Sequence, residues 1–185
     1  LGHLGADTEE PDRAVVVVGH EAEAVTKNLQ EEPCGLTLTF VEQTVQRGTG
    51  DAVAVGLTAL PDNDLDAPAD ADDGDVLVLP GDTPLLHPGT IARLVDEHRY
   101  ANAACTVLTA RFADPTGYGR VERDKDDRVR RIVEHRDADA EQRAIDEVNT
   151  AIYVFRRSLL APALRRLTPD NTQGELYVTD VVEVL

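Results

Sequence analysis

The 185-residue sequence predicts an α/β protein with a doubly wound, mainly parallel sheet and added β-hairpins. Strand-like and helix-like segments alternate in the first half of the chain, which is the pattern of an open parallel sheet with helices on both faces. The apolar side chains of 14–18 and 76–79 form continuous runs, as in strands that are covered on both sides. The length suits one medium domain that buries most of its apolar side chains.

Three strand–helix units are expected in the first half of the chain. Thr49 or Asp51 could cap the second helix, and Pro88 is compatible with the first turn of the third. Residues 61–75 are rich in Asp, Ala and Pro, which favours a solvated loop over a metal site built from the acidic run. The strands are expected at 14–20, 36–43 and 76–79, and the helices at 21–32, 49–60 and 87–101.

The second half is less regular. The segment 118–135 is typical of a hairpin that turns at Asp126 and Asp127, and no internal repeat is evident. A last helix is expected after the segment 172–180. The other expected elements are strands at 104–112 and 148–156 and helices at 137–147 and 157–167.

Composition limits the classes of partner. The formal net charge of −17 argues against nucleic acid and against an anionic membrane surface. The hydrophobic share is 42%, and no apolar run approaches the roughly 18 residues of a membrane span, so we expect a soluble globular chain. Cys34 and Cys105 belong to no CxxC motif and are expected to be buried, reduced thiols, with a disulfide as the alternative. The first 14 residues show no secretory signal, and the absence of methionine suggests a longer gene product.

Asp82 follows directly on an apolar run, in VLVLPGDTPLL (76–86). Ligands of open parallel sheets bind beyond the carboxyl ends of the strands, which is where Asp82 is expected. Pro80 and Pro84 restrict the backbone on both sides of it. A carboxylate in this place suits Mg²⁺ that bridges to phosphate oxygens. The alternative is an aspartate that hydrogen-bonds its own turn, and this stretch alone leaves both readings open.

Two further loops carry candidate ligand-binding residues. In EQTVQRGTGDAV (42–53), Gly48 could let the backbone approach a ligand, and the amide of Gln43 could read a base edge, although the loop matches no established phosphate-binding motif. The second loop, PTGYGR (115–120), is followed by Glu134 and Asn149 near expected strand ends. Carboxylates and amides that share one crevice suit sugar hydroxyls, whereas each residue alone would be an ordinary turn or surface residue.

Five segments together resemble a known family. They occur in the order seen in bacterial bifunctional N-acetylglucosamine-1-phosphate uridyltransferases / glucosamine-1-phosphate acetyltransferases, and the resemblance covers nearly the whole chain. The chain resembles part of the N-terminal uridyltransferase domain, which has a Rossmann-like nucleotide-diphospho-sugar transferase fold. The segments are EQTVQRGTGDAV, VLVLPGDTPLL, DPTGYGRV, RIVEHRDADAEQRAIDEVNTAIYVF and NTQGELYVTDVV.

The resemblance implies a reaction and its site. UTP and N-acetylglucosamine 1-phosphate would give UDP-N-acetylglucosamine, a cell-wall precursor, and pyrophosphate, with Mg²⁺ as cofactor. Asp82 would be the magnesium ligand and the catalytic residue, and Gln43 would contact the uracil. The other implied substrate-binding residues are Gly48 and Thr49 at the uridine, Gly81 beside the metal ligand, and Gly119, Glu134, Asn149, Tyr177 and Thr179 at the sugar.

The chain also departs from the family pattern. The family begins with a strand and a glycine-rich loop followed by a lysine. The resemblance implies that this chain (1–185) starts past them and ends before a second metal-ligating asparagine and the β-helix acetyltransferase domain. We therefore expect an incomplete uridyltransferase domain, inactive alone, from a cytoplasmic, homotrimeric protein. Pro80 replaces a frequent tyrosine, and Ala151 replaces a frequent glycine and could crowd the sugar pocket. The alternatives are another sugar-phosphate nucleotidyltransferase of the same fold and an inert nucleotide-sugar-binding fragment.

Overall fold

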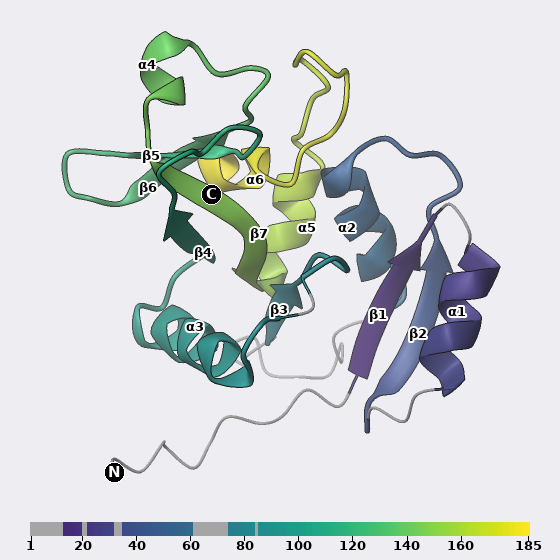
Figure 1. The fold of residues 1–185 in the computed structure, drawn as a ribbon. Coiled ribbons are helices and arrows are strands. Elements are labelled where there is room, and N and C mark those ends of the chain that lie inside the picture. The colour runs from purple at the N-terminus through teal and green to yellow at the C-terminus, as the bar shows by residue number, and fades with distance from the viewer. Residues whose placement is uncertain (1–12, 20–21, 32–34, 61–73, 84) are drawn as a thin grey trace.

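The computed structural model describes residues 13–19, 22–31, 35–60, 74–83 and 85–185 (Figure 1). Strands and helices alternate along the first part of the chain, which confirms the α/β fold class. In chain order the elements are β1 (Arg13–Val18), α1 (Ala22–Glu31), β2 (Thr37–Glu42), α2 (Thr49–Leu57), β3 (Asp75–Val78), α3 (Pro88–Tyr100), β4 (Cys105–Arg111), β5 (Arg120–Arg123), β6 (Val129–Val133), α4 (Ala140–Arg143), β7 (Glu147–Arg156), α5 (Arg157–Leu164) and α6 (Asp180–Val184).

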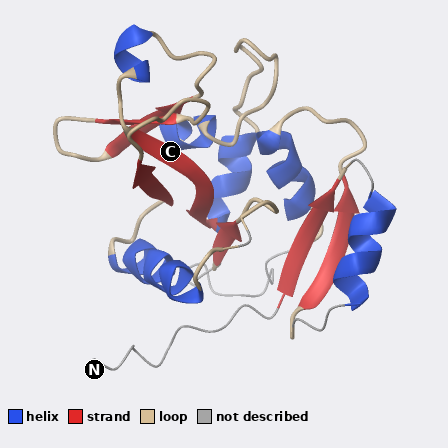
Figure 2. Ribbon diagram, viewed as in Figure 1, coloured by secondary structure: helices blue, strands red, loops and turns tan. Residues whose placement is uncertain are grey.

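The strands form two sheets in the described part of the chain (Figure 2). β1 and β2 pair in parallel as a two-stranded sheet. In the larger sheet, β7 lies between β3 and β4 and is antiparallel to both, so β3 and β4 point in the same direction. The β5–β6 hairpin is joined to β7 through β5. The inserted antiparallel strand β7 is a feature that the continuous apolar runs do not reveal.

β7 is the centre of the larger sheet. Residues 153–155 have no exposed surface, and their side chains alternate between the two faces, as in any strand. Tyr153 and Phe155 pack with α5 and α6, in a cluster that includes Leu160 and Val181. On the other face, Val154 packs with side chains from α3. The helices therefore cover both faces of this part of the strand, which explains the continuous apolar run at 151–155.

β7 contains an irregularity beside the middle of its length. Val107 of β4 is paired with Tyr153, but Thr109 is paired with Asn149, so β7 holds extra residues between these two pairs. Within them Ala151 has a φ of 61°, in the left-handed region that disfavours residues with a Cβ atom. The Asn149 side-chain oxygen accepts a hydrogen bond of 3.0 Å from the Ala151 backbone N–H and supports this turn of the backbone.

A buried histidine ties α3 to the sheet. Nδ1 of His98 lies 2.8 Å from the hydroxyl of Thr106 on β4, and Nε2 lies 3.3 Å from a carboxylate oxygen of Asp75 on β3. Burial lowers the pKa of His98 and outweighs the opposing effect of Asp75, so the neutral ring is favoured. This arrangement is satisfied internally and lies at the start of β3, away from the loop that follows the strand.

Most of the expected elements are confirmed, including the hairpin, whose turn has Asp127 at a φ of 62°. The helix expected at 137–147 is wrong in length: only Ala140–Arg143 is helical, because Asp139 caps it and β7 already begins at Glu147. Neither Thr49 nor Asp51 caps α2, whose N-cap is Gly48 without a side-chain bond. The solvated loop at 61–75 falls almost wholly outside the described residues, as do Cys34, Pro84 and the ends 20–21 of the first strand and helix.

Replacing Ala151 with glycine should stabilise the protein. Relief of the left-handed strain is worth about 1–2 kcal/mol, and the extra freedom of glycine in the unfolded chain offsets about 0.5–1 kcal/mol of it. We expect the free energy of unfolding to rise by about 0.5–1 kcal/mol, measured by thermal and denaturant unfolding. Ala54→Gly inside α2 is the control and should lower it by about 1 kcal/mol. A loss of stability in Ala151→Gly would contradict the strain at this residue.

Candidate functional site

The loop between β2 and α2 holds its candidate residues in a fixed arrangement. The backbone N–H of Gln43 donates to the Val18 carbonyl oxygen at 2.8 Å, which extends the pairing of β2 with β1. The Gln43 side-chain nitrogen donates to a carboxylate oxygen of Asp51 at 2.8 Å and to the Gly48 carbonyl at 3.2 Å. Because a carboxylate can only accept, the amide nitrogen of Gln43 must face Asp51, and the amide oxygen, which bonds to no described residue, is left as an acceptor for a ligand.

Gly48 is the tightest point of this loop. Its φ is 108°, and a Cβ atom built on it would lie 2.5 Å from the Leu176 carbonyl oxygen. Only glycine fits both the conformation and the space. This close approach brings the start of α2 against the segment 171–179, which we call the bridging segment.

The bridging segment is bonded to the β2–α2 loop through three hydrogen bonds. The Leu176 N–H donates to the Arg47 carbonyl at 2.7 Å, and the Gly50 N–H donates to the Leu176 carbonyl at 2.7 Å. The Val178 N–H donates to the Thr49 hydroxyl at 3.0 Å. The Thr49 hydroxyl therefore holds the bridging segment, a role that its expected contact with uridine did not include.

Gly119, Glu134 and Asn149 come together at the end of the β5–β6 hairpin. The Asn149 N–H donates to the Gly119 carbonyl at 2.9 Å, and a Cβ atom on Gly119 would lie 3.5 Å from both carboxylate oxygens of Glu134. The Asn149 side-chain nitrogen donates to the hydroxyl of the buried Tyr153 at 2.7 Å. The predicted sugar-side residues thus form one cluster, and its second layer is Tyr153, which the sequence did not single out.

This sugar-side cluster lies where β7 is not covered by a strand. On that side of β7, β3 reaches only to the pair Val78–Tyr153, and β5 begins at the pair Arg120–Val148. The residues between them include Asn149 and the left-handed Ala151. The irregularity in β7 therefore lies between its pairings with β3 and β5, beside the buried Asn149.

Burial governs the charges at this place. Desolvation raises the pKa of Glu134, although the hydrogen bond from Thr179 opposes the change. Burial together with the nearby carboxylate of Glu134 raises the pKa of Asp180 to about 6. Glu134 forms no ion pair within the described residues, so its carboxylate is suited to neutral O–H and N–H donors.

The bridging segment also contacts the loop 134–139. The Thr179 hydroxyl donates to Glu134 at 3.2 Å, the Thr172 N–H donates to the Asp137 carboxylate at 2.8 Å, and Arg136 donates to the Gln173 side chain at 2.6 Å. Figure 1 shows the segment, in yellow, between α2 and the β5–β6 hairpin. It therefore joins the β2–α2 loop, where the uridine is expected, to the sugar-side cluster.

Tyr177 is positioned by the same segment. Its ring is buried, and its hydroxyl accepts a hydrogen bond of 2.7 Å from the Gln173 side chain. Asp51, Asp137 and Gln173 were not predicted as site residues, because their roles depend on contacts between distant segments. All three lie in segments that carry the family resemblance, which was the signal the sequence offered for them.

Asp82 and Gly81 lie in the exposed turn that follows β3. The turn is closed by the Thr83 hydroxyl, which donates to the Pro80 carbonyl at 3.1 Å. Within the described residues the Asp82 carboxylate has no hydrogen bond or ion pair, and a Cβ atom on Gly81 would meet no atom within 4 Å. Asp82 does not hydrogen-bond its own turn, which was the alternative reading of this residue.

The donor set at Asp82 can be compared with the needs of Mg²⁺. Nowhere in the described part of the chain do three or more acidic, histidine or cysteine side chains gather as a metal site. Mg²⁺ does not require such a cage, because it commonly binds one or two carboxylates and takes its other ligands from substrate phosphates and water. One exposed carboxylate with free oxygens fits that type of site.

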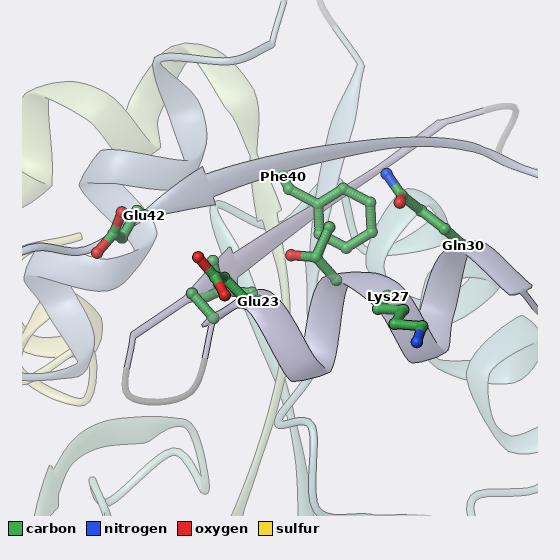
Figure 3. A pocket seen from close by; sticks show the side chains of 8 residues that line it. Glu23, Lys27, Gln30, Phe40 and Glu42 are labelled. Atoms are coloured by element: carbon green, nitrogen blue, oxygen red, sulfur yellow. The ribbon is translucent and has the colours of Figure 1, made fainter.

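A groove of about 380 Å³ lies elsewhere, between α1 and the β1–β2 sheet (Figure 3). Phe40 on β2 points toward α1, and Glu23, Lys27 and Gln30 line the helix side. The groove shares no residue with the cluster described above. Convergent polar groups define a site better than open volume does, so we take the cluster as the candidate site.

The Cys105 thiol is not a reactive group. Burial raises the pKa of the Cys105 thiol to about 12, which keeps it protonated and unreactive. The expectation of a free thiol is confirmed for Cys105, which is half-buried rather than fully buried. Among the described residues, no helix has the length and apolarity to cross a bilayer.

Comparison with known proteins agrees with the fold and the motifs. The chain is 48% identical over 176 residues to the bifunctional protein GlmU of Prochlorococcus marinus (strain MIT 9313). The aligned region covers 95% of this chain and 37% of that protein. It is 45% identical over 188 residues to the bifunctional protein GlmU of Thermobifida fusca (strain YX). That aligned region covers 100% of this chain and 37% of that protein. The chain thus spans little more than a third of these relatives.

Solved structures show the same fold at low sequence identity. A UDP-glucose pyrophosphorylase complexed with UDP-glucose matches 91% of this chain and 67% of its own, with a TM-score of 0.65 and 13% identity. HddC from Yersinia pseudotuberculosis complexed with GMP-PN matches 91% of this chain and 63% of its own, with a TM-score of 0.60 and 15% identity. The sequence profile of nucleotidyl transferases matches residues 6–185, and the chain belongs to that family.

Proposed function

We propose that the protein forms UDP-N-acetylglucosamine and pyrophosphate from UTP and N-acetylglucosamine 1-phosphate. The observation that carries the proposal is the bridging segment, which joins a loop with an amide acceptor to a cluster with a half-buried carboxylate and an amide. A nucleotide and a sugar can thereby be held at the two ends of one continuous site. The similarity to the bifunctional GlmU proteins supports the choice of these substrates.

The uridine end would be the β2–α2 loop. The free Gln43 amide oxygen can accept the N3–H of uracil, whereas the corresponding nitrogen of cytosine is an acceptor and would be repelled. Gly48, with no side chain, lets a flat base approach the backbone. Thr49 would act at this end mainly by keeping the bridging segment in place.

The sugar end would be the sugar-side cluster. Glu134 has no cationic partner in the described residues and would accept hydrogen bonds from sugar hydroxyls. Asn149 is held on two sides, by Tyr153 and by the Ala151 N–H, so its remaining donor and acceptor capacity points in a fixed direction. The backbone of Gly119 would meet the N-acetyl group. Tyr177 and Thr179 would close the sugar side.

The chemistry would be an in-line displacement. A sugar-phosphate oxygen forms a bond to the α-phosphorus of UTP, and the bond from that phosphorus to the bridging oxygen of pyrophosphate breaks. The protein contributes mostly positioning and charge compensation. Mg²⁺ bound at Asp82, which is exposed and unpaired, would supply positive charge to the phosphate groups in a chain of net charge −17.

The function is tested by pyrophosphate release from the protein in the full length that its gene encodes. Several sugar 1-phosphates would be compared with UTP, and several nucleoside triphosphates with N-acetylglucosamine 1-phosphate. We expect the highest kcat/KM for UTP with N-acetylglucosamine 1-phosphate. A clear preference for another sugar phosphate or base would assign a different nucleotidyl transfer.

We also propose that the protein, in the full length that its gene encodes, is cytoplasmic and assembles as a homotrimer.

Asp82→Asn should lower kcat at least tenfold in that protein. The amide keeps the shape of the side chain but loses the negative charge that a hard divalent cation prefers. Little change in the thermal midpoint is expected, because Asp82 is exposed and bonds to no described residue. Asp96→Asn, an exposed carboxylate on α3, is the control. Unchanged activity of Asp82→Asn, with its Mg²⁺ requirement retained, would remove Asp82 from the metal site.

Asp137→Ala should raise the KM for the sugar phosphate up to about tenfold, because loss of a charge-assisted hydrogen bond to the bridging segment costs about 1.4 kcal/mol. The KM for UTP should change less, since the contacts at 47–50 remain. Steady-state kinetics with each substrate varied would measure this. Glu141→Ala, which removes an exposed carboxylate on α4, should change neither value. Equal increases for both substrates would contradict the separation of the two ends.

A further inference from the structure

Arg120 is a buried cation that forms no ion pair with a described carboxylate, although the exposed carboxylate of Asp114 lies near enough to interact with it electrostatically. Its side chain is among the largest that are fully buried, with only 1% of its surface exposed. It takes part in no ion pair within the described residues, and its Nε atom has no hydrogen-bond partner there. Burying a guanidinium in this way costs stability, and apolar side chains of similar volume commonly replace buried charges at no loss. Stability alone therefore does not explain an arginine at this position.

The guanidinium bridges two loops. One terminal nitrogen donates to the Tyr118 carbonyl, and the other lies 3.3 Å from Nδ1 of His135. Arginine can only donate, so Nδ1 of His135 must be the acceptor, and the ring is the neutral tautomer with its hydrogen on Nε2. A fork with two separated donors can reach both partners at once, which the single ammonium group of lysine cannot do.

These two partners are the chain neighbours of two proposed sugar-binding residues. Tyr118 precedes Gly119, and His135 follows Glu134. The backbone of Arg120 is paired with Val133 on one side and with Val148 on the other, so its side chain starts between the strands that carry this cluster. The guanidinium therefore lies beside the sugar-side cluster and is shielded from solvent.

We propose that Arg120 is a positioning residue for sugar recognition, which fixes the distance between Gly119 and Glu134 by clamping Tyr118 to His135. The inference rests on the proposed function of these two residues. Without the clamp the two loops could separate, and the Glu134 carboxylate would lose its alignment with the backbone at Gly119. The uridine-side loop is bonded to other segments and would keep its geometry.

The test uses the protein in the full length that its gene encodes and compares the Arg120→Met variant with the wild type. Methionine replaces the stem of the side chain and lacks the donors. We expect the KM for the preferred sugar 1-phosphate to rise about tenfold, with the KM for UTP and kcat changed less than threefold. Arg120→Lys should recover only part of the loss. Proportional losses in both KM values, or no change in the sugar KM, would overturn the proposal.

Arg123→Met is the matched control. Arg123 lies on the same strand but bonds to Glu147, away from the sugar-side cluster. It should lower the thermal midpoint and leave the sugar KM within twofold. A rise in the sugar KM as large as that of Arg120→Met would show that any damage to β5 has this effect and would overturn the proposal.

A second variant covers the case in which Arg120→Met does not fold. His135→Ala removes the acceptor at one end of the clamp and should raise the sugar KM several-fold in a protein with an ordinary cooperative thermal transition. An unchanged sugar KM in His135→Ala would overturn the proposal by itself. The wild-type assay separates the two levels: if wild type uses no sugar 1-phosphate, the proposed function fails, whereas a normal wild type with unaffected variants refutes only the clamp.

Discussion

The structure depends on β7, one buried strand that pairs with three others. Its second half is enclosed by β3 and β4, and its first half meets β4 and the β5–β6 hairpin. Its pairing with β4 is irregular where the neighbours on the other edge change, and the left-handed residue Ala151 lies at this irregularity. Asn149 lies next to it and bonds to Gly119. The place of the candidate site thus follows from how the sheet changes partners along β7.

Charge is the second constraint on the site. Glu134, Asp137 and Asp180 lie close enough to influence one another, and the pKa values of Glu134 and Asp180 are raised. Such a region repels a triphosphate unless a cation accompanies it, and the whole chain carries a net charge of −17. The same region accepts hydrogen bonds from neutral hydroxyls without penalty. The distribution of charge therefore favours a sugar at Glu134 and places the need for a metal ion at the phosphates.

The sequence predicted most elements because their apolar periodicity and turn residues are local signals. The β5–β6 hairpin, α3 with Pro88 in its first turn, and the strand at 76–79 are examples. It did not reveal that β7 is antiparallel, since a run of buried residues does not show direction. The prediction of a helix at 137–147 was wrong for a related reason. The helix ends at Arg143, and Ile145 belongs to the connection that leads into β7.

The candidate site was likewise predictable only in part: its motif residues were expected, but the contacts that hold them were not. Gly119, Glu134 and Asn149 were expected together from motif order, and the structure brings them together. The contact between Thr49 and the bridging segment, and the clamp of Arg120, join residues that are distant in sequence and leave no periodic signal. Asp82 keeps its predicted place after β3, but no described residue shows what it binds. Local pattern thus points to candidate ligand-binding residues more readily than to the groups that hold them in place.

The most direct test of the central claim is a crystal structure of the protein, in the full length that its gene encodes, with UDP-N-acetylglucosamine and Mg²⁺. The account predicts uracil against the Gln43 amide oxygen, the sugar hydroxyls on Glu134 and Asn149, and the bridging segment between them. A sugar bound away from Glu134, or the nucleotide bound in the groove beside α1, would contradict it.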